Sequence, residues 1–322
     1  MSKTSYKPIK PFLTYDQQIQ HLEEDKLLII KDHSTAKESL LNISYYALIG
    51  GYKTLFYDHM TRTYLPGTTF EDILTLYKFD DALRHLIFDY SNFIEQKLRS
   101  TMSYAFCDRY TNLQKDYLDP NHYQNTRKNR YNINKLVNIL DYIANKDTDH
   151  EYTLYQRNTY GNVPLYAATK VMTFGQLSAM YSLQAHGIQV KVSRDFSTKR
   201  TALSNTDLID YLHVLTHFRN RCAHIERLFS YKDRYDIPDT ALHDKLGIGK
   251  NGNQYVCGKH DLFAVVIAYR YLLPKEEFKE FKKELIKLIN KTIKKASTLT
   301  EAKLITAMGF PNNWKDISKY RV

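Results

Sequence analysis

The hexapeptide Arg219-Asn220-Arg221-Cys222-Ala223-His224 combines residue types that could cleave a phosphodiester bond. Arginine is a permanent cation whose planar fork suits phosphate, and histidine can take or give a proton near neutral pH. On RNA, the 2′-OH would be the nucleophile, the His224 imidazole its base, and the Arg219 guanidinium would stabilise the charge on the phosphoryl oxygens. This chemistry needs no metal. Arginine and histidine five residues apart are a weak signal alone, because any long basic chain contains a few such pairs.

The element that must position these groups is a helix predicted over residues 204–225. Its buried stripe is Leu208, Leu212, Leu215, Phe218, Cys222 and Ile225. On an ideal helix Arg219 and His224 lie about 140° apart, so they do not share a face. The face of His224 instead holds Asn220, with His213, His217 and Arg221 near it. Arg219 therefore curls around the helix, or the helix loosens near its end, or Arg219 holds structure in place. A twofold dimer, in which two such helices face each other and each supplies half of one cleft, would also bring the two groups together.

Other sites near this helix are weaker. A histidine near a helix carboxyl end is also favoured there by the helix dipole, which is a structural alternative for His224. His213 and His217 have the spacing of a metal pair, but no acidic third ligand stands at a matching spacing, so we expect no metal. The sequence has no phosphate-binding glycine loop and no nucleophile elbow, and we expect no cofactor.

The charge of the chain favours a polyanionic partner. The 322 residues include 46 Lys and Arg against 35 Asp and Glu, a formal charge of +11. The 27 tyrosines could stack on unpaired bases or could simply fill helix–helix contacts. We expect RNA contacts from basic residues in three stretches: Arg127, Lys128 and Arg130; Lys191, Arg194, Lys199 and Arg200; and Lys279, Lys283 and Lys287.

Two charged patterns have two interpretations each. Glu95 and Arg99 are four residues apart on a predicted helix, and form either a surface ion pair or a support that orients the side chains of the His224 helix. Lysines recur every four residues from Lys275 to Lys295. They form either a solvated helix face or a track for the RNA backbone.

Apolar periodicity predicts an all-α protein, because no convincing series of alternating strands appears. Thr14 and Gln17 match a capping box. The strongest signal is an uninterrupted amphipathic pattern over residues 68–106. Short helices are expected in the polar stretch 108–170, including one near 133–143. Further helices are predicted over 14–25, 32–50, 174–183, 261–272, 274–295 and a last short one to Gly309, with loops over 58–69 and 186–203.

Cysteine usage and hydropathy favour a cytoplasmic protein. The cysteines Cys107, Cys222 and Cys257 form no CxxC pair, and the first residues have no apolar signal-peptide core. No stretch reaches the roughly 18 apolar residues of a membrane span. Neither a membrane nor DNA is an expected partner.

Several stretches together resemble the Abi family of bacterial abortive-infection proteins, of the AbiD and AbiF type. These are Ile43–Tyr46 with Gly50–Tyr52, Gly67–Asp80, Ile94–Arg99, Thr173–Ser178 and Arg219–Leu228. That family is placed in the HEPN superfamily, whose helical bundles act as metal-independent RNases through an R-x4-6-H motif at a dimer interface. The resemblance implies that Arg219 and His224 are the catalytic pair, that Asn220 is the polar residue that often follows the arginine, and that the protein is a homodimer.

The resemblance also implies a partner RNA, because AbiF-like members are associated with a small structured non-coding RNA. Two positions depart from relatives. Ile225 stands where many have a second histidine, and Glu226 replaces the tyrosine of HEPN toxins controlled by a nucleotidyltransferase in toxin–antitoxin pairs.

We therefore expect a HEPN-like core over 67–230, with the polar insertion 108–170, and helical extensions over 1–66 and 231–322. The predicted function is that of a phage-defence RNase or RNA-binding toxin that leaves a 2′,3′-cyclic phosphate. The alternative is a catalytically silent module that holds a non-coding RNA, with Arg219 and His224 structural.

Overall fold

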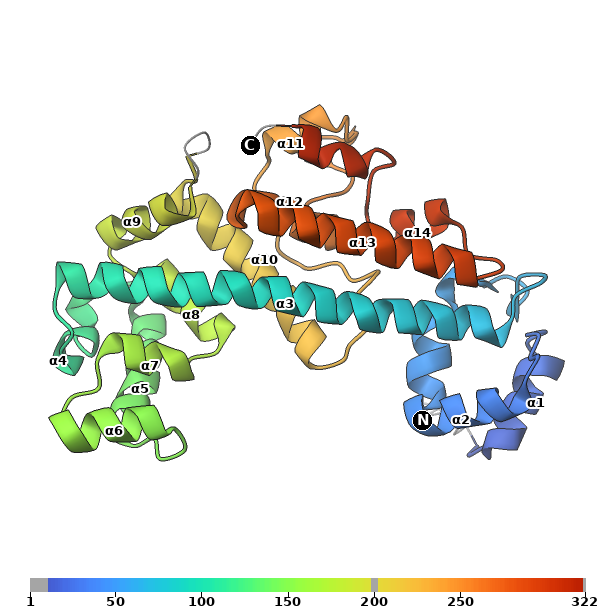
Figure 1. Cartoon of the computed structure of the whole chain (residues 1–322), viewed down its shortest axis with the longest axis horizontal. Helices are drawn as coiled ribbons and strands as arrows, with labels where there is room; N and C mark the ends of the chain where they lie inside the picture. The colour runs from blue at the N-terminus through green and yellow to red at the C-terminus, as the bar shows by residue number, and fades with distance from the viewer. Residues whose placement is uncertain (1–10, 198–201, 321–322) are drawn as a thin grey trace, which may run out of the picture. The chain divides into compact units, whose positions relative to one another are not determined.

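The computed structural model describes residues 11–197 and 202–320, and helices dominate it (Figure 1). The strands in this part of the chain form two short hairpins, so the predicted all-α class is confirmed. The chain divides into two compact units: residues up to Ala82 with Ile286–Leu304, and Leu83–Leu285 with residues from Ile305 onward. The division into segments 1–66, 67–230 and 231–322 stays a prediction.

The first unit begins with α1 (Tyr15–Glu24), which Thr14 and Gln17 cap as predicted. The helix expected over 32–50 is shorter: α2 (His33–Ile43) ends at Ser44, whose φ of 74° is incompatible with a continuing helix. The loop expected over 58–69 contains one strand of a hairpin. The remaining elements are a π turn η1 (Tyr46–Gly50), a 3-10 turn η2 (Lys53–Leu55), and strands β1 (Tyr57–Asp58) and β2 (Thr63–Tyr64).

The predicted long helix is α3 (Phe70–Arg109), with 40 residues. Asp72 in its first turn is 1% exposed and accepts hydrogen bonds from the Thr69 amide (3.0 Å) and from the Ser297 amide (2.6 Å) and Thr298 hydroxyl (3.0 Å). The carboxylate thus satisfies amide and hydroxyl groups that the helix start would otherwise bury without partners.

The second unit follows the predicted order of helices closely. Short helices fill residues 108–170, and the helix expected over 174–183 has those bounds. The elements that lie wholly in this unit are α4 (Gln114–Tyr117), η3 (Pro120–His122), α5 (Arg130–Asn145), α6 (Glu151–Tyr160), α7 (Leu165–Val171), α8 (Phe174–Leu183), α9 (His186–Phe196), α10 (Asn205–Ala223), α11 (Ala241–Lys245), β3 (Lys250–Asn251), β4 (Gln254–Tyr255), α12 (Leu262–Leu272) and η4 (Trp314–Lys319). Helices α13 (Lys275–Lys295) and α14 (Glu301–Ala307), like α3, have residues in both units.

The loop predicted over 186–203 is wrong for most of its length, because α9 occupies residues 186–196. Ile188, Val192 and Phe196 recur every four residues and are buried, so they form one apolar face. The basic residues between them conceal this period in the sequence. Lys199 and Arg200 lie outside the described residues.

Helix α10 is the central helix of the second unit and packs against α8, α9 and α12. Ser204 caps its start by accepting the Asp207 amide at 3.0 Å. Leu212, Leu215 and Phe218 are fully buried. At Gly175 of α8, a Cβ atom would lie 3.4 Å from the Thr216 side chain of α10, which is van der Waals contact and marks where the two helices meet. None of the helices in the described part of the chain is both long and apolar enough to span a membrane.

Asp72 makes stability depend on pH. Burial alone would raise the pKa of this carboxyl, but hydrogen bonds from Thr69, Ser297 and Thr298 hold it below its ordinary value. Its stabilisation is therefore present above the unfolded pKa of about 3.9 and is lost as pH falls through the lower folded pKa. We expect Asp72→Ala to lower the free energy of unfolding by about 3 kcal/mol at pH 7, measured by urea unfolding.

The matched control is Asp72→Asn, which keeps the shape and loses the charge. Its stability should change less between about pH 6 and about pH 3 than that of the unsubstituted protein. An equal acid sensitivity of the two proteins would contradict this account.

Candidate functional site

A cleft of about 410 Å³ lies at the carboxyl end of α10. One wall is the helix face predicted from spacing, and it holds His217, Asn220, Arg221 and His224. The opposite wall is the segment that follows the helix and contributes Glu226, Tyr231, Lys232, Asp233 and Arg234. The cleft thus gathers two imidazoles and several cations on one side of α10, which crosses α3 (Figure 1).

The helix end closes with a tight chain reversal. His224 is the C-cap, and Ile225 adopts a left-handed φ of 56°. The Glu226 amide donates to the Arg221 carbonyl (3.0 Å) and the Ile225 amide to the Cys222 carbonyl (3.2 Å), which is the Schellman pattern. A β-branched residue is unusual in this conformation. The reversal turns the chain back along α10 and so builds the second wall of the cleft.

Asp233 fixes the ring of His217. The Nδ1 atom of His217 lies 2.8 and 3.0 Å from the two oxygens of this carboxylate, whose side chain is 1% exposed. A carboxylate on Nδ1 sets the tautomer of an imidazole and leaves Nε2 for other chemistry. Asp233 has no signal in the sequence, because it lies in a turn-rich segment at no helical spacing from His217.

His213 does not join this arrangement in the cleft. Its ring packs 4.0 Å from that of Tyr235 and 4.9 Å from that of His217. Burial, and next the charge of His217, lower the pKa of His213. A histidine with a lowered pKa is neutral at physiological pH, so His213 acts as packing beside His217.

Arg234 lines one wall of the cleft, and the guanidinium on the helix wall is that of Arg221. Its Nη2 atom lies 2.7 Å from the Glu226 carboxylate, and its guanidinium lies over the ring of Tyr231 at 3.9 Å. The Nε atom is buried and has no hydrogen-bond partner among the described residues. The side chain as a whole is 29% exposed and lines the cleft, so its guanidinium suits an anionic ligand.

Arg219 does not line the cleft formed by the described residues, in agreement with the angle expected on a helix. Its Nη2 donates to the Glu95 carboxylate on α3 at 3.2 Å, and its guanidinium lies 5.1 Å from the centre of the Phe88 ring. Arg219 and His224 are thus only five residues apart in the sequence, but they lie on different sides of α10.

Glu95 joins two arginines rather than one. Its other oxygen accepts from Arg99 Nη2 at 2.7 Å, and its side chain is only 8% exposed. Arg99 also donates to the carbonyls of Thr169 (2.8 Å) and Met172 (3.3 Å) at the end of α7. Glu95 and Arg99 are therefore not an exposed surface ion pair, which was one of the two interpretations of their spacing. The Glu95 and Arg99 side chains connect α3, α7 and α10.

The basic residues expected to contact RNA lie elsewhere on the chain. Arg127, Lys128 and Arg130 are exposed around the start of α5, and Arg194 is exposed on α9. Lys191 is paired with Asp108 at 2.6 Å. On α13, Lys287 is exposed, whereas the exposed Lys279 and Lys283 lie 3.4 and 3.1 Å from Glu276 and Glu280. Pairs this exposed are worth little, so these lysines remain accessible to a polyanion.

Ligands for a metal were also sought. Across residues 11–197 and 202–320, no three His, Cys, Asp or Glu side chains are grouped in a way that could hold an ion.

The left-handed conformation of Ile225 predicts a stabilising substitution. A side chain with a Cβ costs about 1–2 kcal/mol in this conformation, whereas glycine adopts it freely. The Ile225 side chain is 69% exposed, so its removal loses little packing. We expect Ile225→Gly to raise the free energy of unfolding by about 1 kcal/mol in urea. Ile225→Ala keeps a Cβ and is the control, so a gain of the same size in both variants would contradict the strain.

The sequence was compared with known proteins. No curated protein and no solved structure matches it. A family model described as "Abi-like protein" matches residues 38–230, which include α3, α8, α10 and most of the residues that line the cleft. Because this match spans more than half of the 322 residues, the chain belongs to the Abi-like protein family.

Proposed function

We propose that this protein is a metal-independent endoribonuclease of the HEPN type, similar to AbiD and AbiF proteins. Membership of the Abi-like family supports a role in abortive infection, which is a defence against phage. The proposed partners are RNA substrate and a small structured non-coding RNA, in the cytoplasm. The observation that carries the proposal is the cleft that holds His217, Arg221 and His224 together.

The two histidines suit the two proton transfers of RNA cleavage. They are seven residues apart on α10, which places them within about 20° of one direction and about 10 Å apart along the axis. His224 takes the proton of the 2′-OH as its oxygen attacks phosphorus. The bond from phosphorus to the 5′ oxygen then breaks, and protonated His217 gives its proton to that oxygen. The products are a 2′,3′-cyclic phosphate and a 5′-OH.

The other residues of the cleft position and stabilise the reacting phosphate. The Arg221 guanidinium, which lines the cleft, suits the charge that develops on the phosphoryl oxygens. Asn220 lies one turn before His224 and can orient the same phosphate. Asp233 is a positioning residue, because it acts through the ring of His217.

Arg219 enters the proposal through a homodimer. Its guanidinium is held by Glu95 on the side of α10 away from His224 in the same chain. Two copies of α10 that face each other would supply Arg219 from one chain and His224 from the other. The resulting site would hold two guanidinium groups, Arg219 and Arg221, around one phosphate.

The alternative function is a catalytically silent module that holds a non-coding RNA. The network of Arg219, Glu95 and Arg99 favours it, because this network gives Arg219 a structural role within one chain. Cleavage assays separate the two functions.

We expect the protein to cleave RNA in EDTA and to leave 2′,3′-cyclic phosphate ends, measured by mass spectrometry. His224→Ala should lower the rate by about 10²-fold or more, because it removes the general base. His217→Ala should lower the rate of RNA cleavage similarly. It should lower the rate of cleavage of uridine 3′-(4-nitrophenyl phosphate) far less, because the 4-nitrophenolate leaving group needs no proton. His186→Ala, an exposed histidine on α9, is the control.

If the unsubstituted protein and every variant leave RNA intact under conditions where the protein kills cells, the nuclease is ruled out and the silent module is favoured. A requirement for a divalent metal would rule out this mechanism.

Mixing inactive variants tests the shared site. If Arg219 and His224 of one site come from different chains, Arg219→Ala and His224→Ala proteins should each be inactive and should regain activity when co-refolded. A mixed dimer retains one intact site of two, and about half of the dimers are mixed, so we expect about a quarter of the unsubstituted rate. No recovery, with a dimer present by light scattering, would assign Arg219 a role inside its own chain.

A further inference from the structure

A second concave surface lies in the same unit, between α5 and the start of α8. Its volume is about 740 Å³. The residues that line it come from α5, from the segment between α5 and α6, and from the end of α7 and start of α8: Tyr131, Asn134, Lys135, Asn138, Ile139, Tyr142, Ile143, Asp147, Asp149, His150, Val171, Thr173 and Gln176. Nothing in the catalytic proposal uses this groove.

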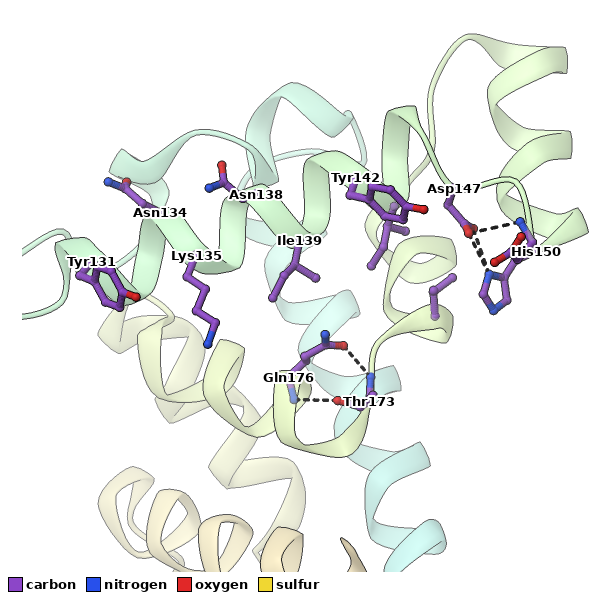
Figure 2. A pocket seen from close by; sticks show the side chains of 13 residues that line it. Tyr131, Asn134, Lys135, Asn138, Ile139, Tyr142, Asp147, His150, Thr173 and Gln176 are labelled. Carbon is purple, nitrogen blue, oxygen red and sulfur yellow. Dashed lines mark hydrogen bonds and ion pairs between the residues drawn. The ribbon is translucent and has the colours of Figure 1, made fainter. Parts of the chain in front are cut away.

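The α5 wall carries a stripe of aromatic and amide side chains. Tyr131 is 77% exposed and Tyr142 is 55% exposed, which is far more than a core tyrosine allows. They are eleven residues apart, so they lie within about 20° of one direction and about 16 Å apart along the helix. Asn134 and Asn138 lie between them, one turn apart. Figure 2 shows both tyrosine rings on this wall, with the two asparagines along its edge.

The opposite wall is rigid. Thr173 and Gln176 form a capping box at the start of α8, in which the Thr173 amide donates to Gln176 Oε1 (2.8 Å) and the Gln176 amide to Thr173 Oγ1 (3.3 Å). Lys135 and Ile139 point from α5 toward this box (Figure 2). The groove therefore has an apolar floor, one cation, and fixed walls.

The two ends of the groove differ in charge. At the amino end of α5 stand the exposed Arg127, Lys128 and Arg130. At the other end Asp147 is 3% exposed and bonded to Thr153 and His150, at 2.9 and 3.0 Å. The basic end would therefore attract the phosphates of a polyanionic strand most strongly, so we expect the strand to be held chiefly from that end.

We propose that this groove binds a single-stranded segment of RNA through its bases, and this rests on the proposed function, which makes RNA the partner. Exposed tyrosine rings stack unpaired bases, and asparagine amides pair with base edges as both donors and acceptors. The span between the rings holds about five stacked bases at about 3.4 Å each, or fewer in an extended strand. A duplex fits poorly, because its base faces are already stacked.

The test uses the full chain with His224→Ala, so that binding does not depend on cleavage. The probe is a fluorescein-labelled 12-nucleotide CA-repeat RNA, measured by fluorescence anisotropy as a single strand and annealed to its complement. Loss of one stacking ring weakens binding about 5- to 150-fold. We expect losses in this range for Tyr131→Ala and Tyr142→Ala with the single strand and less than about 2-fold with the duplex.

Two controls keep the result specific. Tyr131→Phe and Tyr142→Phe keep the rings and should bind within about 2-fold of the parent. Tyr46→Ala removes a tyrosine that is 88% exposed and does not line the groove, and should also bind normally.

The proposal that the groove binds RNA is overturned if both alanine variants bind the single strand as the parent does, or if the parent does not bind the single strand. The fate of the nuclease is separate. If the protein with His224 cleaves RNA but both alanine variants bind the single strand as the parent does, only the proposed binding groove is wrong. If the alanine variants bind the single strand more weakly but the protein with His224 cleaves no RNA, only the proposed nuclease is wrong.

Discussion

The carboxylate of Glu95 is the interaction on which the site depends. A carboxylate with so little exposure must have cationic or hydrogen-bonding partners, and it has two arginines from two helices. Removing one partner of such a buried group costs up to about 3–5 kcal/mol. Because Arg219 is fixed to α3, the rotation of α10 about its own axis is fixed as well. The face about 140° away, with His224, must then point to the other side, where residues 226–234 close the cleft.

The second constraint is the chain reversal after α10. The left-handed Ile225 and the two Schellman hydrogen bonds return the chain alongside the helix. Asp233 then contacts His217 two turns before the helix ends, so the cleft wall is attached at both ends. A strained residue beside a reactive side chain persists only where surrounding structure enforces it, and here the Asp233–His217 contact and the buried Leu228 and Phe229 do so.

Sequence patterns predicted what depends on local order. The period of α3, the capping box of Thr14 and Gln17, and the separate faces of Arg219 and His224 all follow from helical geometry, which a sequence contains directly. The patterns failed where a contact joins distant segments. Glu95 and Arg219 are 124 residues apart, and Asp233 returns through a turn whose left-handed residue is an isoleucine rather than the usual glycine. Helix α9 was missed for a different reason, because charged residues diluted its apolar face of Ile188, Val192 and Phe196.

The proposed catalytic cleft and the proposed RNA groove are separate places in the fold that share one support. A cleft of about 410 Å³ suits a phosphate and its sugar, and such a site has little surface with which to choose a sequence. In our proposal, bases are recognised along α5, where rings and amides are exposed. Helix α8 connects the two places, because Thr173 and Gln176 form a wall of the groove while the same helix packs against α10 at Gly175. A strand held on α5 would thus be held by the helix pair that positions His217 and His224, so the choice of RNA and its cleavage would depend on the same packing.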